Sequence, residues 1–444
     1  MGARSGFQAQ LKRDLPHVFV LGCICHSLAL SASAASHKLP SWLEAWIKDV
    51  CSYFSRSSKR QHEFHLIQEA LQSPRHKILK LSQTRWLSRG AVIARIIEQW
   101  DALMLFFQCQ SPVDKIDGAH QIYKTMTTSG TKHMMLFLNY IVPKIDTLNL
   151  EFQSESFRLH RVFASIRDGY REILSMFVRE GVMESADLAE IDPTNTANFK
   201  PWQEVNVGGR CTADVQRAPL QDKEKNFRED CRSYLFQLCC ETRKRFDLTP
   251  NSLLAHLPCI DPENALSTNR VKSIVPLAIK MPQLVSEEDL DVLDDQWRAL
   301  VHYKDTLKDV SMDPSQFWYH IQQVKDGNGV PKFLVLRKFM CALLVLPQSS
   351  ACVERIFSEV NMIKTPRTNR LHASSVQNRI LARQCVARDS GTSCHTWKPR
   401  KCIVEDVMYG RCHKRYVDAN QTRKNEETVR FYDPEDRKID QSLS

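Results

Sequence analysis

The spacing of hydrophobic residues in the first quarter of the chain predicts a mixture of strands and helices. His17–Cys25 (HVFVLGCIC) is rich in apolar and β-branched residues, as expected of a buried strand, and Lys77–Leu81 (KILKL) is a possible second strand. Ser41–Phe54 is a predicted helix with Ser41 as its N-cap. From Arg89 to Phe107 apolar residues recur with a 3.6-residue period, which predicts a longer helix. This part of the chain is therefore expected to be α/β.

Between about residues 108 and 310 the pattern is helical and shows no strand alternation. Clear helical segments are Lys132–Tyr140, Phe157–Glu180 and Glu224–Lys244. Residues 191–222 contain prolines and two adjacent glycines, so we expect a loop or a junction between helical sub-bundles there.

The last third of the chain has the clearest helical pattern. Lys332–Leu346 is apolar nearly all round, so that helix must be covered on most sides, and Pro347 ends it. Gln348–Ser350 offers N-caps for the next helix. That next helix carries an apolar stripe made of Val353, Ile356, Phe357, Val360 and Ile363. A basic turn, Lys364–Arg370, leads to a third helix at about 373–385.

Composition narrows the class of protein. The chain has 444 residues, of which 43% are hydrophobic and 25% charged, so two or three ordinary globular domains are expected. It has no 18-residue apolar run and no apolar leader, which argues against a transmembrane helix and a secretory signal. Fifteen cysteines without a leader indicate reduced thiols. The net charge of +10 favours a polyanionic partner such as nucleic acid, or simply a basic surface.

Cys23, Cys25 and His26 stand close together at the end of the first predicted strand. A structural zinc site needs four ligands, usually in two pairs, and no second pair follows closely. A catalytic thiol would need an identified histidine partner and an exposed position. We therefore favour packing of small polarisable side chains, with a metal site as the alternative. A second group could supply one zinc site, but its spacing favours a basic surface segment; it comprises Cys394, His395, Cys402, Cys412 and His413.

Two single residues and one charged region could act on nucleic acid. Trp86 in a loop is either a core plug or a platform for an unpaired base. Glu354 lies at the edge of the apolar stripe, where it is either a metal ligand or an ordinary helix-edge glutamate. Residues 354–388 hold seven basic residues against Glu354 and Glu359, a net charge of +5 that suits a phosphate backbone or a solvated rim.

Three blocks, in this order, resemble the hAT superfamily of transposases and the host proteins derived from them. Residues 19–30 (FVLGCICHSLAL) resemble its Cys-x-x-His motif, with Cys23 and His26 in the motif positions. Residues 84–87 (TRWL) resemble its Thr-Arg-Trp block. Residues 346–371 (LPQSSACVERIFSEVNMIKTPRTNRL) resemble its C-terminal block, with the Ser-x-x-x-Glu-Arg-x-Phe-Ser core.

The resemblance implies a fold and a division into domains. The fold would be a partial ribonuclease-H-like α/β fold interrupted by a large all-α insertion. The expected parts are a ribonuclease-H-like region at 1–107, a helical insertion at 108–316, a dimerisation region at 317–388 and a polar, mobile tail at 389–444. The resemblance also implies a nuclear location and self-association. The dimerisation residues would be Leu343, Leu346, Val353, Ile356, Phe357 and Val360.

The resemblance further implies a chemistry. Active members use two aspartates and a glutamate to hold two metal ions that activate a nucleophile for attack on a phosphodiester. Glu354 matches the glutamate, and Trp86 matches a tryptophan that stabilises a flipped base. The predicted DNA-binding residues are Arg85, Trp86, Arg367, Arg370 and Arg379.

This sequence departs from the family pattern before Cys23. The family aspartates precede the Cys-x-x-His block, whereas here 22 residues precede Cys23 and their only acid, Asp14, lies too close to the predicted strand. We therefore expect a transposase-derived, self-associating protein that is no longer an enzyme, with possible residual DNA binding. It would need no cofactor, and a divalent metal such as Mg²⁺ only if the aspartates were supplied upstream.

Two alternatives stay open. The chain could be a truncated piece of an active hAT transposase, or a helical scaffold that binds proteins and not DNA. A membrane and a small-molecule substrate are not expected as partners in any of these hypotheses.

Overall fold

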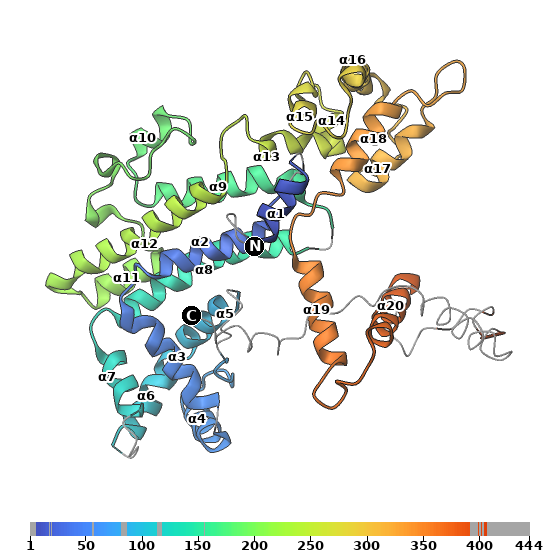
Figure 1. The fold of residues 1–444 in the computed structure, drawn as a ribbon. Coiled ribbons are helices and arrows are strands. Elements are labelled where there is room, and N and C mark those ends of the chain that lie inside the picture. The colour runs from blue at the N-terminus through green and yellow to red at the C-terminus, as the bar shows by residue number, and fades with distance from the viewer. Residues whose placement is uncertain are drawn as a thin grey trace, which may run out of the picture. The chain divides into compact units, whose positions relative to one another are not determined.

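The structure is a computed structural model. It describes residues 6–16, 18, 20–55, 57–80, 87–112, 118–154 and 156–390, together with residues 398, 401, 404 and 405. The chain divides into two compact units, Met1–Ser350 and Ala351–Ser444, whose helices are labelled in Figure 1.

The first unit is built from helices joined by turns, longer irregular segments and short 3₁₀ segments. Its first eight α-helices are α1 Phe7–Asp14, α2 Ile24–Ser36, α3 Ser41–Ser55, α4 Ser58–Ala70, α5 Leu87–Glu98, α6 Trp100–Gln110, α7 Gly118–Thr127 and α8 Thr131–Phe152. The next are α9 Val162–Ser175, α10 Glu180–Ser185, α11 Gly209–Arg217, α12 Glu224–Arg245 and α13 Leu253–His256. The last are α14 Pro262–Ala265, α15 Val275–Ile279, α16 Leu290–Leu300, α17 Pro314–His320 and α18 Leu334–Leu343.

Short 3₁₀ segments and the second unit complete the order of elements. The 3₁₀ segments are η1 Leu159–Arg161, η2 Thr196–Asn198, η3 Trp202–Glu204, η4 Gln221–Lys223, η5 Leu257–Ile260, η6 Glu287–Asp289, η7 Val301–Tyr303 and η8 Ile321–Gln323. The second unit contains α19 Ala351–Ile363 and α20 Ala373–Ser390.

The fold is all-α, so the predicted α/β, partial ribonuclease-H-like fold is wrong. The described residues contain no β-strand, only isolated bridges at Val178–Phe199 and Lys325–Pro331. None of the helices in the described ranges is both long enough and apolar enough to cross a lipid bilayer.

The apolar run at His17–Cys25 leads into a buried helix instead of forming a strand. His17 and Phe19 lie outside the described residues, and the described residues between them and Ile24 form no regular element. Cys23 is the N-cap of α2, where Ile24, Cys25 and Leu28 are buried. A short apolar run does not distinguish a strand from the first turn of a buried helix, and here the helical continuation decides between them.

In place of the second predicted strand, Lys77–Leu81, residues 77–80 form no regular element and are held by side chains; Leu81 lies outside the described residues. Arg95 Nη1 donates to the carbonyl of Lys77 at 2.6 Å. Just before this segment, Gln68 Nε2 donates to the carbonyl of His76 at 2.9 Å. Because side chains from the neighbouring helices α4 and α5 satisfy these carbonyls, the segment needs no partner strand.

The helices predicted in the same region are confirmed in outline. Ser41–Phe54 corresponds to α3. The single helix predicted at Arg89–Phe107 is two helices, α5 and α6, that meet at Gln99. The Gln99 side chain is fully buried, accepts a hydrogen bond from Gln68 Nε2 at 2.7 Å and donates to the carbonyl of Pro74 at 3.1 Å. This polar anchor lies where the helical run is interrupted.

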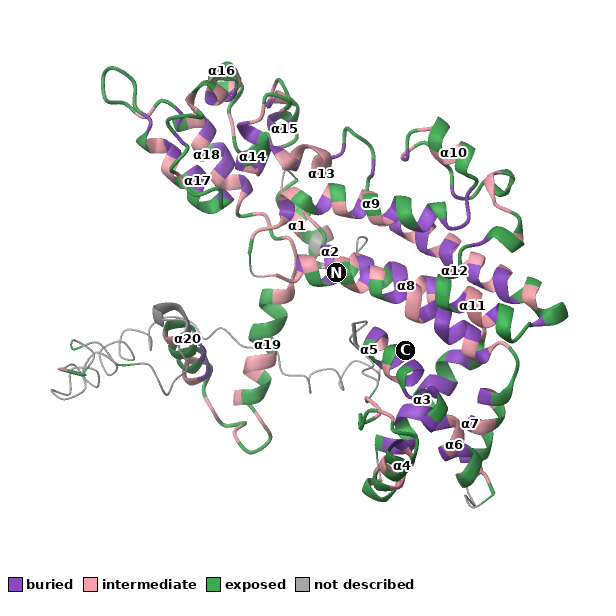
Figure 2. Cartoon of the chain, turned by 180° about the vertical axis from the view of Figure 1, so that it is seen from behind, coloured by how far each residue is buried: buried purple, intermediate pink, exposed green. Residues whose placement is uncertain are grey.

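The centre of the first unit is α2, which packs against α8 and α12 (Figure 1). Ala32 and Ala35 of α2 are completely buried, and small side chains at these positions let the neighbouring helices approach closely. Figure 2 shows the buried faces of α2, α8 and α12 turned toward one another. Two further helices extend this layer, because α5 packs on α8 and α9 packs on α12.

An aromatic cluster holds the sub-bundle of α3, α4, α6 and α7 together. Phe54, Phe64 and Phe106 are all buried, and their ring centroids lie 5.0–5.7 Å apart. The indole nitrogen of Trp46 donates to the carbonyl of Ile122, which joins α3 to α7. Aromatic pairs at this spacing add to the burial of their area.

The predicted helical middle is confirmed in its main elements. Lys132–Tyr140 is part of α8, Glu224–Lys244 is part of α12, and the segment predicted at Phe157–Glu180 contains η1 and α9. The expected loop at 191–222 contains one α-helix, α11, whose Cys211 and Val215 are buried.

Helix α18, predicted as apolar nearly all round, is covered mainly on one face. Its Leu336, Phe339, Met340 and Leu343 are buried, whereas Leu334 at its start is 40% exposed. The helix also ends earlier than predicted. It stops at Leu343, and residues 344–350 form no helix.

Asp146 is an uncompensated carboxyl where α5 crosses α8. Its Oδ1 is buried without a hydrogen-bond partner, and Gly90 of α5 makes room for it, since a Cβ there would overlap Asp146 Oδ2. Burial raises the pKa of Asp146 to about 7. The folded protein therefore keeps this proton at pH values where the unfolded chain has lost it.

We predict that Asp146→Asn stabilises the protein more at pH 8 than at pH 4. The folded pKa of Asp146 lies above the unfolded value, so its contribution to stability is retained below about pH 4 and is lost as pH rises toward 7. Thermal unfolding of both proteins at each pH measures the difference. Asp168→Asn, at an exposed carboxylate of α9, is the control and should show no such increase. Equal stabilisation by Asp146→Asn at both pH values would contradict the prediction.

Candidate functional site

The second unit presents a pair of helices joined by a hydrogen-bonded turn. Helices α19 and α20 pack against each other, and Arg383 Nε lies 3.8 Å from Glu359 Oε1. In the turn, the Thr368 hydroxyl donates to the carbonyl of Ile363 at 2.6 Å and accepts from the backbone N–H of Thr365 at 2.8 Å. The predicted basic turn is thus a defined reversal of the chain.

One face of α19 is apolar and accessible. Val353, Ile356 and Phe357 are 47%, 39% and 62% exposed, and Val360 is half-buried. These four residues fall at helical spacing i, i+3, i+4 and i+7, and we call them the α19 apolar face. By contrast, Val376 and Ile380 of α20 are buried. The pair of helices therefore covers part of its apolar surface and leaves the α19 apolar face open.

The other predicted dimerisation residues lie in the first unit. Leu343 is completely buried in its core, and Leu346 is half-buried against that core. Neither side chain belongs to the α19 apolar face.

The predicted DNA-contacting residues are divided in the same way. Arg367, Arg370 and Arg379 are exposed, the first two in the turn and the third on α20. Arg85 and Trp86 lie outside the described residues. The described part of the predicted nucleic-acid surface is thus the basic turn and the outer face of α20.

Glu354, which matches the family glutamate, is exposed on α19. Among the described residues no group of three or more His, Cys, Asp or Glu side chains is placed to share a metal ion. The donors present around Glu354 therefore do not fit the two-metal site that the resemblance implies, and we derive no catalytic step from it. The second cysteine and histidine group, from Cys394 to His413, lies outside the described residues.

Cys23 lies among hydrogen-bond donors from two distant parts of the first unit. Its Sγ caps α2 by accepting from the backbone N–H of His26 at 3.5 Å. Ser350 approaches the same sulfur with its backbone N–H at 3.3 Å and its hydroxyl at 3.4 Å. We call Cys23, Cys25, His26 and Ser350 the Cys23 cluster. The motif histidine takes part through its backbone.

The Cys23 cluster favours a thiolate. Hydrogen bonds from the Cys25 thiol, from Ser350 and from the His26 N–H lower the pKa of Cys23 to about 5, although partial burial opposes this. The carbonyl of Asn149, 3.6 Å from the Cys25 sulfur, competes for the single Cys25 proton. The donors from Ser350 and His26 do not depend on that proton. The sequence interpretation of Cys23 as a packing residue missed this, because Ser350 is far away in the chain.

Gln348 fixes the same stretch of chain to the first unit. Its Oε1 accepts from the backbone N–H of Arg158 at 2.5 Å. Its Nε2 donates to the carbonyls of Ser154 at 2.9 Å and Ser156 at 3.0 Å. Gln348 and Ser350, which the sequence offered as N-caps, thus hold the end of the first unit in place immediately before α19.

A search of the chain against protein-family models found no match. The resemblance to hAT transposases therefore rests on the motifs in the sequence.

We predict that Cys23 reacts with iodoacetamide at a rate that levels off above about pH 6, because a pKa near 5 leaves it ionised there. Ser350→Ala removes one donor and should move this profile to higher pH. Mass spectrometry of the Cys23 peptide measures the rate, and N-acetylcysteine, whose thiol ionises near pH 8.5, is the reference. A Cys23 profile that follows the reference would contradict the prediction.

Proposed function

We propose that the protein is a transposase-derived, self-associating protein in which the α19 apolar face binds the same face of a second copy. In this proposal the protein acts by binding and not by catalysis. The observation that carries it is the exposure of Val353, Ile356 and Phe357 at helical spacing on one face of α19. The sequence resemblance of residues 346–371 to a family dimerisation block gives independent support.

The energy available from this face supports a specific contact. Complete burial of one large aliphatic or aromatic side chain is worth about 1.5–3 kcal/mol. Two helices alone are a marginal structure in water, so an exposed apolar stripe favours a partner that completes the core. In a two-fold arrangement each copy contributes these side chains, and this doubles the apolar area removed from water.

The rim of the α19 apolar face suits a second copy. Glu354 and Glu359 carry negative charge on α19, and Arg355 carries positive charge. A surface with both signs around an apolar centre can be complementary to itself, which two-fold symmetry requires. An exclusively acidic or basic rim would repel its own copy.

We predict that Phe357→Asp weakens self-association at least about thirtyfold, as truncation of a central apolar side chain in an interface does. Light scattering of the full chain across micromolar concentrations measures the mass, and circular dichroism checks that helix content is retained. Met362→Asp is the matched control. Met362 is 63% exposed, against 62% for Phe357, but it lies about 140° round the same helix. A monomeric wild-type chain, or equal effects of both variants, would contradict the proposal.

DNA binding is a second candidate function, favoured by the exposure of Arg367, Arg370 and Arg379 within a region of net charge +5. Such residues would contact phosphates and give affinity without base specificity. Under the protein-scaffold hypothesis, the α19 apolar face is still a binding surface, whereas these three arginines contact solvent and not DNA.

We predict that replacing these three arginines by Gln weakens binding to a fluorescein-labelled DNA duplex and flattens its salt dependence. The slope of log K against log salt should fall by about 0.9 for each phosphate that the variant no longer neutralises. Fluorescence anisotropy across a salt series measures the slope. The control replaces Lys59, Arg75 and Arg171, which are exposed but lie within 4.0 Å of carboxylates in the first unit. No binding by the wild type at low salt would favour the scaffold.

A further inference from the structure

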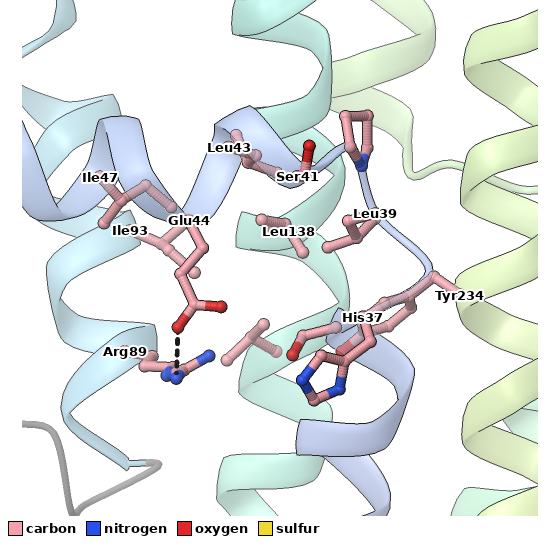
Figure 3. A pocket seen from close by; sticks show the side chains of 13 residues that line it. His37, Leu39, Ser41, Leu43, Glu44, Ile47, Arg89, Ile93, Leu138 and Tyr234 are labelled. Carbon is pink, nitrogen blue, oxygen red and sulfur yellow. Dashed lines mark hydrogen bonds and ion pairs between the residues drawn. The ribbon is translucent and has the colours of Figure 1, made fainter.

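A cavity of about 260 Å³ lies beside Tyr234 in the first unit, between α3, α5, α8 and α12, and side chains that line it are drawn in Figure 3. Arg89 Nη2 donates to Glu44 Oε1 at 2.8 Å, so these two charges of the lining compensate each other. The Tyr234 hydroxyl is buried and has no surface open to a ligand. The described residues of the lining therefore select no particular class of ligand. The Cys23 cluster, by contrast, combines groups that can react.

Two thiols lie together at the start of α2. The thiol of Cys25 is a donor to the sulfur of Cys23, two residues before it in the chain. Cys23 is half-buried and its neighbour His26 is exposed, so this end of α2 lies at the surface of the first unit. Cys25 is only 8% exposed. The pair therefore consists of an outer thiol that small solutes can approach and an inner thiol that is largely shielded from them.

The surroundings of Cys23 stabilise a negative charge on its sulfur. The backbone N–H of His26 and both donors of Ser350 lie 3.3–3.5 Å from it. Because Cys23 is the N-cap of a helix of 13 residues, the positive end of the helix dipole also acts on the sulfur. Hydrogen bonds, of which that from Cys25 is the largest, lower the pKa of Cys23 to about 5 against the effect of burial. The nucleophilic form of a cysteine is the thiolate, which therefore predominates here at neutral pH.

We propose that Cys23 is an oxidation site for small hydroperoxides such as hydrogen peroxide, and that Cys25 is the thiol that resolves the oxidised product. A hydroperoxide is small and uncharged, so it needs no binding pocket to reach a half-buried sulfur. The Cys23 sulfur attacks one peroxide oxygen and the O–O bond breaks. The leaving hydroxide takes up a proton to give water. The sulfur has then lost two electrons, which reduce the peroxide, and is a sulfenic acid.

The second step uses the neighbouring thiol. The Cys25 sulfur attacks the oxidised sulfur of Cys23, so that an S–S bond forms and the S–O bond breaks. Hydroxide leaves from Cys23 and takes the proton of the Cys25 thiol, which gives a second water. The product is a disulfide between the two residues, and a dithiol reductant returns both to thiols.

Oxidation at Cys23 changes how residues 344–350 are attached to α2. The reduced sulfur accepts from the backbone N–H and the hydroxyl of Ser350. A disulfide sulfur carries no charge and is a weaker acceptor than a thiolate, so both hydrogen bonds weaken. Gln348 keeps its bonds to the carbonyls of Ser154 and Ser156, so the segment loosens at its Ser350 end. This inference depends neither on self-association nor on DNA binding.

The test treats the reduced full chain with hydrogen peroxide and follows each cysteine by mass spectrometry. At pH 6 Cys23 should react about five to ten times faster than free cysteine, because its larger thiolate fraction outweighs the lower intrinsic nucleophilicity of a low-pKa thiol. Cys109, which is exposed on α6, is the control within the same chain and should react more slowly than Cys23. The product should be a disulfide between Cys23 and Cys25.

Two variants separate the steps. Cys25→Ser keeps a side-chain donor and removes the second thiol, so the sulfenic acid of Cys23 should persist and be trapped by dimedone. Ser350→Ala removes one donor and should slow the oxidation of Cys23 at pH 6. Hydrogen exchange of the amides at 344–350 should become faster when the wild type is oxidised, and should not change when Cys23→Ser is treated in the same way. Circular dichroism checks that each variant retains its helix content.

Three results would each overturn the proposal. The first is a Cys23 that reacts no faster than Cys109. The second is equal labelling of Cys23 by dimedone in the wild type and in Cys25→Ser, which would exclude Cys25 as the resolving thiol. The third is hydrogen exchange at 344–350 that oxidation of the wild type leaves unchanged.

Discussion

The first unit depends on the burial of α2 between α8 and α12. Ala32 and Ala35 have no exposed surface, and their side chains are single methyl groups. Adding volume to so tightly packed a contact costs about 1–3 kcal/mol, because the neighbouring helices must move apart. The position of α2 also affects the outer helices, because α5 packs on α8 and α9 packs on α12. Two alanines of α2 therefore contribute to the close spacing of the longer helices α8 and α12.

The position of α2 also explains how the two ends of the first unit meet. Its N-cap, Cys23, accepts hydrogen bonds from Ser350, and Gln348 is bound to the turn that follows α8. The chain between Leu343 and Ser350 has no helix of its own, so these side-chain bonds hold it. A thiolate is a stronger acceptor than a thiol, and its ionisation therefore strengthens the attachment. Helix α2 is thus held by packing against α8 and α12 and, at its N-terminus, by hydrogen bonds to Cys23.

Features set by residues close together in the chain could be predicted from the sequence, whereas features set by contacts between distant residues could not. Helices α3, α8, α12 and α19 follow from local hydrophobic spacing, and that spacing survives in the structure. The predicted strands failed because their burial and their backbone partners come from elsewhere, as when Arg95 satisfies Lys77. The α19 apolar face was predictable from its period, whereas Leu343 was predicted to be a dimerisation residue and lies in the core of the first unit. The Ser350 donors and the unpartnered Tyr234 hydroxyl involve contacts across the fold, and no local pattern marks them.

The α19 apolar face and the cavity beside Tyr234 differ in how they could bind a partner, because one is an exposed surface and the other is a hollow of limited volume. The α19 apolar face is exposed along a helix, so its energy comes from area removed from water and grows with the size of the partner. The cavity beside Tyr234 has a limited volume, so a partner larger than this volume gains no further burial there. A protein surface can cover the α19 apolar face but cannot enter the cavity. An exposed helix face and a hollow of this volume therefore place different limits on a partner, and each must be judged from its own contacts.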